Sequence, residues 1–319
     1  MREVLAWPGP DACFSLKKGV HQVPVEYQLV TLTADDGHEH DALFVIDERA
    51  ARRRMRMTGR STACMHVHGI MGNFLVGTLR FLSAPLAREG FPVLIVETRM
   101  GNIGQLVGPG IFDRARQDLT AGSRWLREGG WDHLISMGYS SGASLSTRWA
   151  ATAHVPWLRG LALLGAPWGL PEAMEVRAAT WGATPSYDEI YARADAVVHD
   201  PSGPEADRLF VIEHSRGPSA QPQHSEVYTY RTWWNSRGPK ATAAKTHLQI
   251  AQVRAPILLV QGTTDIIVSP QEAEQLAEVA RQGGNDDVEV SVIEGADHFF
   301  AGREFVTIEA VVRWLREHA

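Results

Sequence analysis

The sequence predicts an α/β protein built on a mostly parallel β-sheet. From residue 61 onward, short apolar runs alternate with helix-like stretches, which is the pattern of βαβ units. Runs such as residues 257–261 are apolar almost throughout, as expected for strands that helices cover on both faces. The chain has 319 residues, of which 44% are hydrophobic. This is enough for one large core with an inserted subdomain, or for two modest domains.

The N-terminal part is predicted to form an antiparallel hairpin before the main sheet. Residues 23–33 and 42–47 are rich in β-branched and apolar side chains, and the turn residues Asp35, Asp36 and Gly37 lie between them. Residues 48–60 carry six arginines and little that could be buried, so they are predicted to form a solvated loop. The functional alternative for this basic loop is docking of a phosphate-bearing partner, such as a coenzyme A thioester or a carrier protein.

The remaining strands and helices alternate regularly until about residue 166. Strands are predicted at residues 62–67, 92–97, 134–137, 161–164, 257–261 and 288–293, and helices near residues 74–88, 112–128, 143–152, 270–281 and 304–317. Between about 167 and 247 the sequence becomes aromatic and rich in proline and glycine, with residues 201–222 as its least regular part. Such a stretch is too long for an ordinary loop. We therefore expect a core of residues 1–166 and 248–319 and a cap of residues 167–247.

Composition and charge exclude several classes of protein. The formal net charge is -6, without the basic face that a nucleic-acid binder requires. The two cysteines, Cys13 and Cys64, are too few for a disulfide framework and are not spaced like metal ligands. Residues 1–19 lack the pattern of a signal peptide, and no apolar run could span a membrane. We expect a cytoplasmic protein that binds neither nucleic acid nor membrane, with a monomer and a homodimer both open.

The pentapeptide Gly138-Tyr139-Ser140-Ser141-Gly142 is a G-x-S-x-G motif. It follows a strand-like run and opens a helix-like one, which is the setting in which this motif forms a nucleophile elbow. A serine hydroxyl is a weak nucleophile, so the turn must expose it within reach of a base. Ser140 is therefore the candidate nucleophile, and the structural alternative is a serine that only caps a helix.

An acid and a histidine follow the elbow in the chain order Ser, Asp, His. Asp265 comes after the predicted strand 257–261, and His298 comes after the predicted strand 288–293. Because the carboxyl ends of parallel strands meet at one edge of a sheet, these side chains are expected to converge on the serine. His298 would act as the base, and Asp265 would hold its imidazole in one tautomer. Asp297 is a rival acid, but a sequence neighbour of the histidine is poorly placed to reach its Nδ1.

An oxyanion hole is predicted in the loop His68-Gly69-Ile70-Met71-Gly72-Asn73, which ends the first parallel strand. Acyl transfer requires two donors where negative charge develops, and the backbone N–H groups of Ile70 and Ser141 are the expected pair. His66 and His68 also form an H-x-H pair that could begin a metal site. The glycine-rich loop fits an oxyanion turn better, and no metal is predicted.

With these residues in place, the chain resembles the α/β-hydrolase family. The resemblance rests on the His68-Gly69 loop, the elbow at residues 138–142, Asp265, and the Gly-x-Asp-His segment that ends at His298. It implies a mostly parallel, eight-stranded sheet with helices on both faces and an inserted, mainly helical cap after the sixth strand. It also implies a Ser-His-Asp hydrolase that requires no cofactor or metal. Within the family, the chain looks most like bacterial esterases and acyl-hydrolases with a compact helical cap.

We therefore expect a serine hydrolase that cleaves a carboxylic ester of a small, partly hydrophobic acyl substrate through an acyl-enzyme. Thioesterase, lactonase, amidase and carbon–carbon bond hydrolase activities use the same triad and remain alternatives. A non-catalytic protein that holds a small ligand is the alternative from another class, and the intact Ser, Asp and His argue against it. Met71, Tyr139 and Trp168 are expected to line an apolar substrate pocket.

Overall fold

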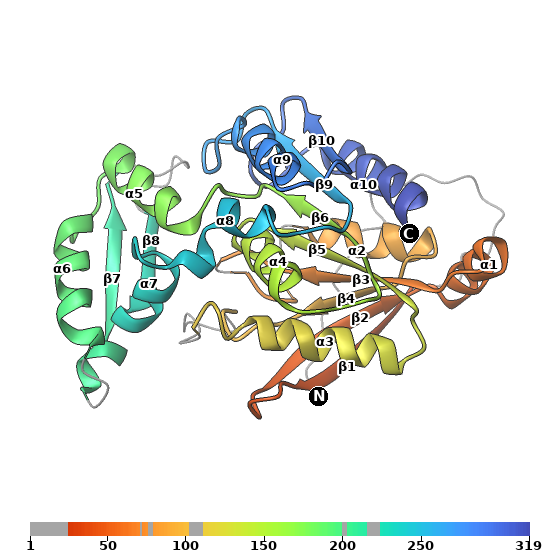
Figure 1. The fold of residues 1–319 in the computed structure, drawn as a ribbon, viewed down its shortest axis with the longest axis horizontal. Coiled ribbons are helices and arrows are strands. Elements are labelled where there is room, and N and C mark those ends of the chain that lie inside the picture. Colours follow the sequence, from red (N-terminus) through yellow and green to blue (C-terminus); the bar gives the residue numbers. More distant parts are fainter. Residues whose placement is uncertain (1–24, 71, 76–78, 102–110, 200–202, 216–223) are drawn as a thin grey trace, which may run out of the picture.

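The centre of the protein is an eight-stranded sheet with the strand order β1-β2-β4-β3-β5-β6-β9-β10 (Figure 1). The computed structural model describes residues 25–319 except 71, 76–78, 102–110, 200–202 and 216–223. The strands of the sheet are β1 (Glu26–Thr33), β2 (Glu39–Ile46), β3 (Thr62–Val67), β4 (Val93–Val96), β5 (His133–Tyr139), β6 (Leu158–Leu164), β9 (Ile257–Gly262) and β10 (Val288–Ile293). The pairs β1–β2 and β2–β4 are antiparallel, and all other pairs are parallel. The predicted mostly parallel α/β fold with eight strands is confirmed.

Helices cover both faces of the sheet. The helices of the core are α2 (Arg80–Arg88), α3 (Arg116–Glu128), α4 (Ser141–Thr152), α9 (Glu272–Gln282) and α10 (Glu304–His318). Side chains alternate between the two faces along each strand. On β3, Cys64 packs in the cluster that contains α2 and α10, whereas Met65 packs in the cluster that contains α3 and α4. This double cover explains why the central strands are apolar throughout.

The basic stretch at residues 48–60 is a helix, and the predicted solvated loop is wrong. Helix α1 (Glu48–Thr58) begins at Asp47, whose side chain accepts a hydrogen bond from Ala50 N, and it ends at Gly59 in the left-handed conformation. Ala50 and Ala51 are buried, while most of the arginines face outward. The helix therefore buries only two small side chains. Because arginines surround them in the sequence, the usual pattern of an amphipathic helix is hard to recognise.

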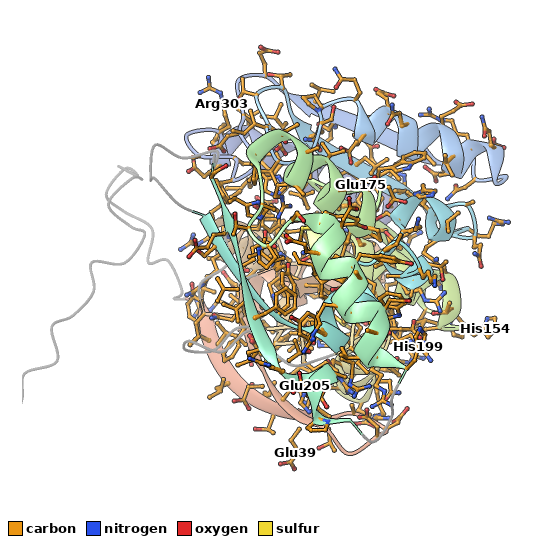
Figure 2. The ribbon with its side chains drawn as sticks, turned by 90° about the vertical axis from the view of Figure 1, so that its left-hand side faces the viewer. Glu39, His154, Glu175, His199, Glu205 and Arg303 are labelled. Carbon is orange, nitrogen blue, oxygen red and sulfur yellow. The ribbon has the colours of Figure 1, made fainter. Side chains whose placement is uncertain are left out.

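Most of the segment between β6 and β9 lies at the left of Figure 1, whereas its last helix, α8 (Thr246–Ile250), packs against α4 and α9 of the core. The segment contains α5 (Leu170–Trp181), α6 (Tyr187–Val198), β7 (Leu209–His214), β8 (His224–Thr229), α7 (Tyr230–Ser236) and α8. Strands β7 and β8 pair antiparallel, although residues 201–222 were expected to be irregular. In Figure 2 the side of the molecule with these elements faces the viewer, and Glu175 on α5 and His199 at the end of α6 are labelled.

The side chains of this segment pack mainly on one another. A small core joins helix and strand residues through Met174, Ile190, Ile212, Tyr228 and Trp233. The segment therefore has its own apolar core and presents one side to the C-terminal ends of the parallel strands. Within the described residues, no helix combines the length and the apolar character that a membrane span requires.

Candidate active site

The elbow at Ser140 has an unusual backbone conformation that its glycines permit. Ser140 lies between β5 and α4 with φ 53° and ψ -123°. A Cβ atom at Gly142 would lie 2.3 Å from the carbonyl oxygen of His68, and one at Gly138 would lie 2.5 Å from that of Gly142. Any larger residue would push the helix away from the strand ends. The backbone strain at Ser140 is of the kind that proteins keep where a side chain must be aimed.

The three predicted triad residues meet at this elbow. Ser140 Oγ lies 3.1 Å from Nε2 of His298, and Nδ1 of the same ring lies 2.7 Å from Oδ2 of Asp265. The imidazole and the carboxylate are both buried. The serine, the histidine and the acid come from the ends of β5, β10 and β9, so strand order along the chain brings them together.

The carboxylate of Asp265 is held by several donors besides the histidine. Its Oδ1 accepts hydrogen bonds from the backbone N–H groups of Ile267 at 2.8 Å and Val268 at 2.9 Å. Its Oδ2 accepts one from Gln261 Nε2 at 2.9 Å. With the carboxylate fixed in this way, Nδ1 of His298 carries its proton toward Asp265 and Nε2 is left to accept one. Gln261 was not identified from the sequence, where it reads only as the end of a buried strand.

The rival acid has a different role. Asp297 Oδ1 accepts hydrogen bonds from Phe299 N at 2.9 Å and from Ala301 N at 3.0 Å. It therefore caps the turn that follows His298, and the imidazole hydrogen bonds to Asp265 instead.

Two further residues position His298. The hydroxyl of Tyr139 donates to the carbonyl oxygen of His298 at 3.1 Å. Gly165 follows β6 with φ 56°, and a Cβ atom there would lie 3.1 Å from Cε1 and 3.2 Å from Nδ1 of the histidine ring. Tyr139 was expected to contact substrate, but the structure places it under the histidine loop, almost fully buried. Gly165 belongs to no sequence motif, so its position next to the histidine could not be predicted.

The predicted oxyanion loop lies directly against the elbow. A Cβ atom at Gly69 would lie 3.2 Å from Cβ of Ser140. The carbonyl oxygen of Gly69 is 2.8 Å from Nδ1 of His68, which donates to it. The Gly69 carbonyl and the Ile70 N–H belong to one trans peptide and point in opposite directions. Because His68 holds the Gly69 carbonyl, the Ile70 N–H points away from the His68 ring.

The N–H groups of Ile70 and Ser141 are both available for a ligand. Within the described part of the chain, neither group donates to a protein acceptor. Ser141 is the first residue of α4, where the N–H has no intrahelical partner and the helix dipole favours negative charge. Among the described residues, the two predicted donors therefore have no acceptor, and both belong to segments that adjoin Ser140.

Two buried histidines lie at the end of β3, His66 within the strand and His68 directly after it. Burial lowers the pKa of each. The pKa of His66 falls to about 4, so its ring is neutral at physiological pH. For His68, burial again lowers the pKa, and Nε2 accepts from Thr98 N and lies 3.2 Å from the Thr98 hydroxyl. Since both nitrogens of His68 are already hydrogen bonded, the H-x-H pair is poorly suited to a metal.

A buried carboxyl group lies behind the oxyanion loop. Glu97 follows β4, is 5% exposed, and its Oε2 accepts a hydrogen bond from Phe74 N at 2.8 Å. Burial raises the pKa of Glu97 to about 7, although the Phe74 N–H opposes the shift. A carboxyl group next to this loop therefore changes its protonation near neutral pH.

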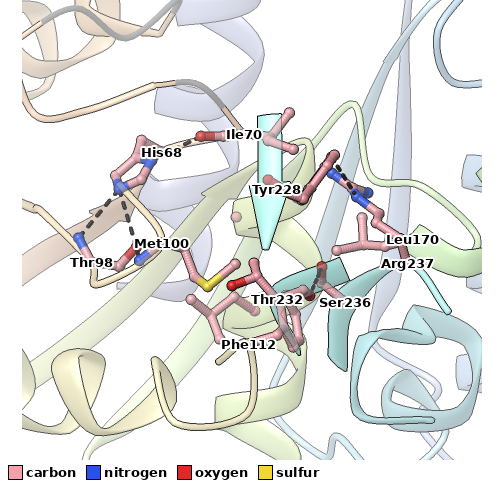
Figure 3. A pocket seen from close by; sticks show the side chains of 14 residues that line it. His68, Ile70, Thr98, Met100, Phe112, Leu170, Tyr228, Thr232, Ser236 and Arg237 are labelled. Carbon is pink, nitrogen blue, oxygen red and sulfur yellow. Dashed lines mark hydrogen bonds between the residues drawn. The ribbon is translucent and has the colours of Figure 1, made fainter. Parts of the chain in front are cut away.

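A pocket opens beside Ser141 and contains residues from both the core and the inserted segment (Figure 3). Its apolar lining consists of Ile70, Met100, Phe112, Leu145 and Leu170. Its polar lining includes Thr98, Tyr228, Thr232, Ser236 and Arg237. Apart from Ile70 and Ser141, these residues were not identified from the sequence, because the fold alone brings them together.

Of the other two expected substrate contacts, Trp168 lies outside this pocket. Trp168 stacks on His247 with ring centroids 4.5 Å apart and packs against the core cluster around α9, outside the lining of this pocket. Met71 lies outside the described residues.

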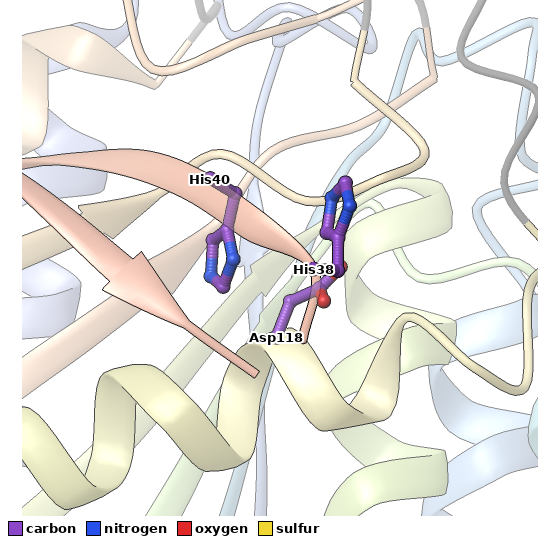
Figure 4. Close-up of side chains that lie close together, drawn as sticks. All are labelled: His38, His40 and Asp118. Carbon is purple, nitrogen blue, oxygen red and sulfur yellow. The ribbon is translucent and has the colours of Figure 1, made fainter. Parts of the chain in front are cut away.

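One group of described residues away from the elbow has the composition of metal ligands. His38, His40 and Asp118 offer ligand atoms within 4.8 Å of one another (Figure 4). Both carboxylate oxygens of Asp118 accept hydrogen bonds from the Arg99 guanidinium, at 2.7 to 3.1 Å. A cation would have to compete with this arginine for the carboxylate, so the cluster is a poor metal site as it stands.

Comparison with known families matches the chain to a hydrolase. The model of the Hydrolase_4 family, described as serine aminopeptidase, S33, matches residues 61–302, which include the elbow, Asp265 and His298. No curated protein sequence matches the chain.

Solved structures share its fold at low sequence identity. DcsB in complex with its substrate analogue has a TM-score of 0.67 at 14% identity, with 92% of this chain and 100% of that chain covered. Est1E from Butyrivibrio proteoclasticus with ferulic acid bound has a TM-score of 0.65 at 13% identity, with 91% and 98% covered. The Pyrococcus furiosus esterase PF2001 has a TM-score of 0.63 at 16% identity, with 92% of each chain covered.

Proposed function

The chain belongs to this family of α/β-hydrolases, and from that premise we propose that it is a serine esterase with Ser140 as nucleophile. The observation that carries the proposal is the unbroken series of hydrogen bonds from Asp265 through His298 to Ser140. A serine with a positioned base and an orienting acid has the geometry required for acyl transfer.

The proposed reaction has two halves. Ser140 Oγ attacks the ester carbonyl as His298 Nε2 takes its proton, and the N–H groups of Ile70 and Ser141 bind the oxyanion. The intermediate collapses, the alcohol leaves with the proton from His298, and the acyl group stays on the serine. Water then attacks the acyl-enzyme with His298 as base, which releases the acid and restores the serine.

The lining of the pocket favours an ester over the substrate of an aminopeptidase. An aminopeptidase must bind the protonated N-terminus of a peptide, which calls for a carboxylate near the reacting carbonyl. Among the described residues that line the pocket there is no carboxylate, and there is one guanidinium, that of Arg237. This charge disfavours a cationic substrate. PF2001 of Pyrococcus furiosus, whose fold is similar, is likewise an esterase.

A thioester of coenzyme A is less well supported. That alternative depended on the basic residues 49–60, which were to bind the phosphates. Helix α1 lies at the opposite end of the molecule from α5, α6 and α7 (Figure 1), and none of its residues lines the pocket.

Labelling by a fluorophosphonate probe tests the proposal. The wild-type protein should be labelled and should hydrolyse p-nitrophenyl esters, and Ser140→Ala should abolish labelling and lower kcat by about 10⁴-fold or more. Ser146→Ala is the matched control, because it removes a buried hydroxyl of α4 that has no partner among the described residues. Absence of Ser140-dependent labelling would contradict the proposal and favour a non-catalytic binding protein.

A further inference from the structure

We propose that the guanidinium of Arg237 forms a subsite for a carboxylate group on the substrate. The inference rests on the proposed function, because it assumes that the substrate has an ester carbonyl at Ser140 and places the carboxylate group elsewhere in the same pocket. It names the substrate class as esters that carry a free carboxylate on either their acyl or their alcohol portion.

Arg237 is a buried cation at the wall of the pocket. Its residue is 3% exposed, and it lines the pocket directly after α7. Its Nε donates to the hydroxyl of Tyr228 at 3.2 Å. Within the described part of the chain, the two terminal nitrogens of its guanidinium have no acceptor. A guanidinium has five N–H donors, so most of its donors remain for a ligand.

Among the described residues, the charges around Arg237 do not balance. Arg177 forms an ion pair with Glu226, and Tyr228 donates its hydroxyl to the other oxygen of that carboxylate at 2.7 Å. Arg177, Glu226, Tyr228 and Arg237 are all at least nine-tenths buried. The cluster therefore contains two guanidinium groups and one carboxylate. A buried charge without a counterion is strongly unfavourable, and a single anionic group in the pocket would neutralise it.

Burial also raises the pKa of Tyr228, so its phenol cannot act as the missing anion. The residues outside the described part include three acidic ones in sequence, Glu3, Asp11 and Asp200, so this charge count is one of the described residues. The net excess of one positive charge matches a carboxylate better than a phosphate monoester, which carries close to two negative charges at neutral pH.

The position of Arg237 in the pocket indicates which chemical groups a ligand needs and in what order. The pocket begins at Gly69 and Ser141, beside the candidate nucleophile, and the guanidinium lines the same pocket on the inserted segment. In Figure 3, Arg237 and Tyr228 lie together on one side of the view and His68 lies on the other, with Ile70 between them. A matching molecule has an ester carbonyl at one end, an apolar spacer and a carboxylate at the other end, which can form paired hydrogen bonds with the guanidinium.

Matched pairs of esters test the proposal. The acyl arm compares mono-p-nitrophenyl glutarate with p-nitrophenyl methyl glutarate, in which the carboxylate is blocked. The alcohol arm compares the butyryl ester of 4-hydroxybenzoate with that of methyl 4-hydroxybenzoate. We expect kcat/KM of the wild-type protein to favour the free acid by at least about tenfold in one arm, which also identifies the portion that carries the charge.

Arg237→Met should remove that preference, since it keeps most of the side-chain volume and loses the charge. Arg208→Met is the control, because Arg208 is an exposed residue of the same segment that does not line the pocket, and it should keep the preference. No preference in either arm, or a preference that survives Arg237→Met, overturns the subsite. If Arg237→Met does not fold, glutarate and its dimethyl ester are compared as inhibitors of the wild-type protein. A glutarate inhibition constant at least about tenfold lower supports the subsite, and equal constants overturn it.

Failure of the proposed function gives a different result. Hydrolysis of the methyl esters without a charge preference keeps the esterase and rejects the subsite. Calorimetric binding of glutarate that Arg237→Met abolishes, in a protein with no Ser140-dependent hydrolysis, rejects the esterase and keeps the subsite.

Discussion

The phenolic hydroxyl of Tyr139 donates a hydrogen bond to the backbone carbonyl of His298, with the two oxygens 3.1 Å apart. The residue before the candidate nucleophile thus supports the loop of the candidate base. Their rings also pack together, with centroids 5.1 Å apart.

Tyr139→Phe should therefore act on catalysis more than on substrate binding. Loss of a buried hydrogen bond costs about 1 kcal/mol, and we expect a lower Tm and a severalfold lower kcat with KM little changed. Steady-state kinetics and thermal melting check this, with Tyr27→Phe on exposed β1 as the control. An increase in KM alone would instead return Tyr139 to the role of a substrate contact.

Gly165→Ala should misplace the imidazole of His298. The added Cβ would lie 3.1 Å from the ring, and φ 56° is unfavourable for alanine. We expect kcat to fall by tenfold or more and the fluorophosphonate reaction to slow. Gly37→Ala is the control, because it has φ 81° with nothing within 4 Å of the new Cβ, so it should cost stability without affecting kcat. Equal effects of the two variants on kcat would show that backbone strain alone is responsible.

Asp265→Asn should lower kcat by about 10⁴-fold, because the amide favours the wrong tautomer of His298. Asp297→Asn changes the other acid in this region, which only caps a turn through Phe299 N and Ala301 N. It should lower Tm and leave the pH profile of kcat in place. Comparable losses of kcat in both variants would contradict the assignment of Asp265 as the orienting acid.

Glu97 should make the protein less stable as the pH rises toward neutrality. Its pKa is raised by burial from 4.5 to about 7, so the folded state binds a proton that the unfolded state has lost between these values. The stabilisation is complete below about pH 4.5 and is lost as the pH rises through about 7, by up to about 3 kcal/mol. Denaturant unfolding between pH 4.5 and 8 should show a smaller decline for Glu97→Gln. Parallel curves for the two proteins would reject the raised pKa.

The positions of Ser140, Asp265 and His298 could be predicted because each follows a strand that the sequence marks clearly. Parallel strands place their carboxyl ends at one edge, so chain order was enough to bring these side chains together. Asp297 could be set aside for a local reason, since a neighbour of the histidine cannot reach its Nδ1.

Helix α1 could not be predicted because its signal is small. Only Ala50 and Ala51 are buried on it, between arginines that dominate the composition. Strand β7 has a pattern of alternating burial, but it lies in a stretch of the sequence that is rich in proline and glycine.

The residues that line the pocket could not be predicted from the sequence for a different reason. Met100 and Phe112 come from the core, and Thr232 and Arg237 come from the inserted segment. They meet only through the way that segment packs on the sheet. The sequence does not reveal that Trp168 stacks on His247.

The chain leaves the central sheet at the end of β6 and returns at β9, the strand with which β6 pairs. The stretch between these two neighbours can be lengthened, shortened or replaced without breaking a strand pair of the central sheet. Ser140, Asp265 and His298 all lie outside this excursion, whereas Tyr228 and Arg237 lie within it. Residues of this stretch that line the pocket, such as Tyr228 and Arg237, can therefore change while Ser140, Asp265 and His298 stay unchanged. Grafting the corresponding stretch of a relative between β6 and β9 is accordingly a direct way to redirect this scaffold.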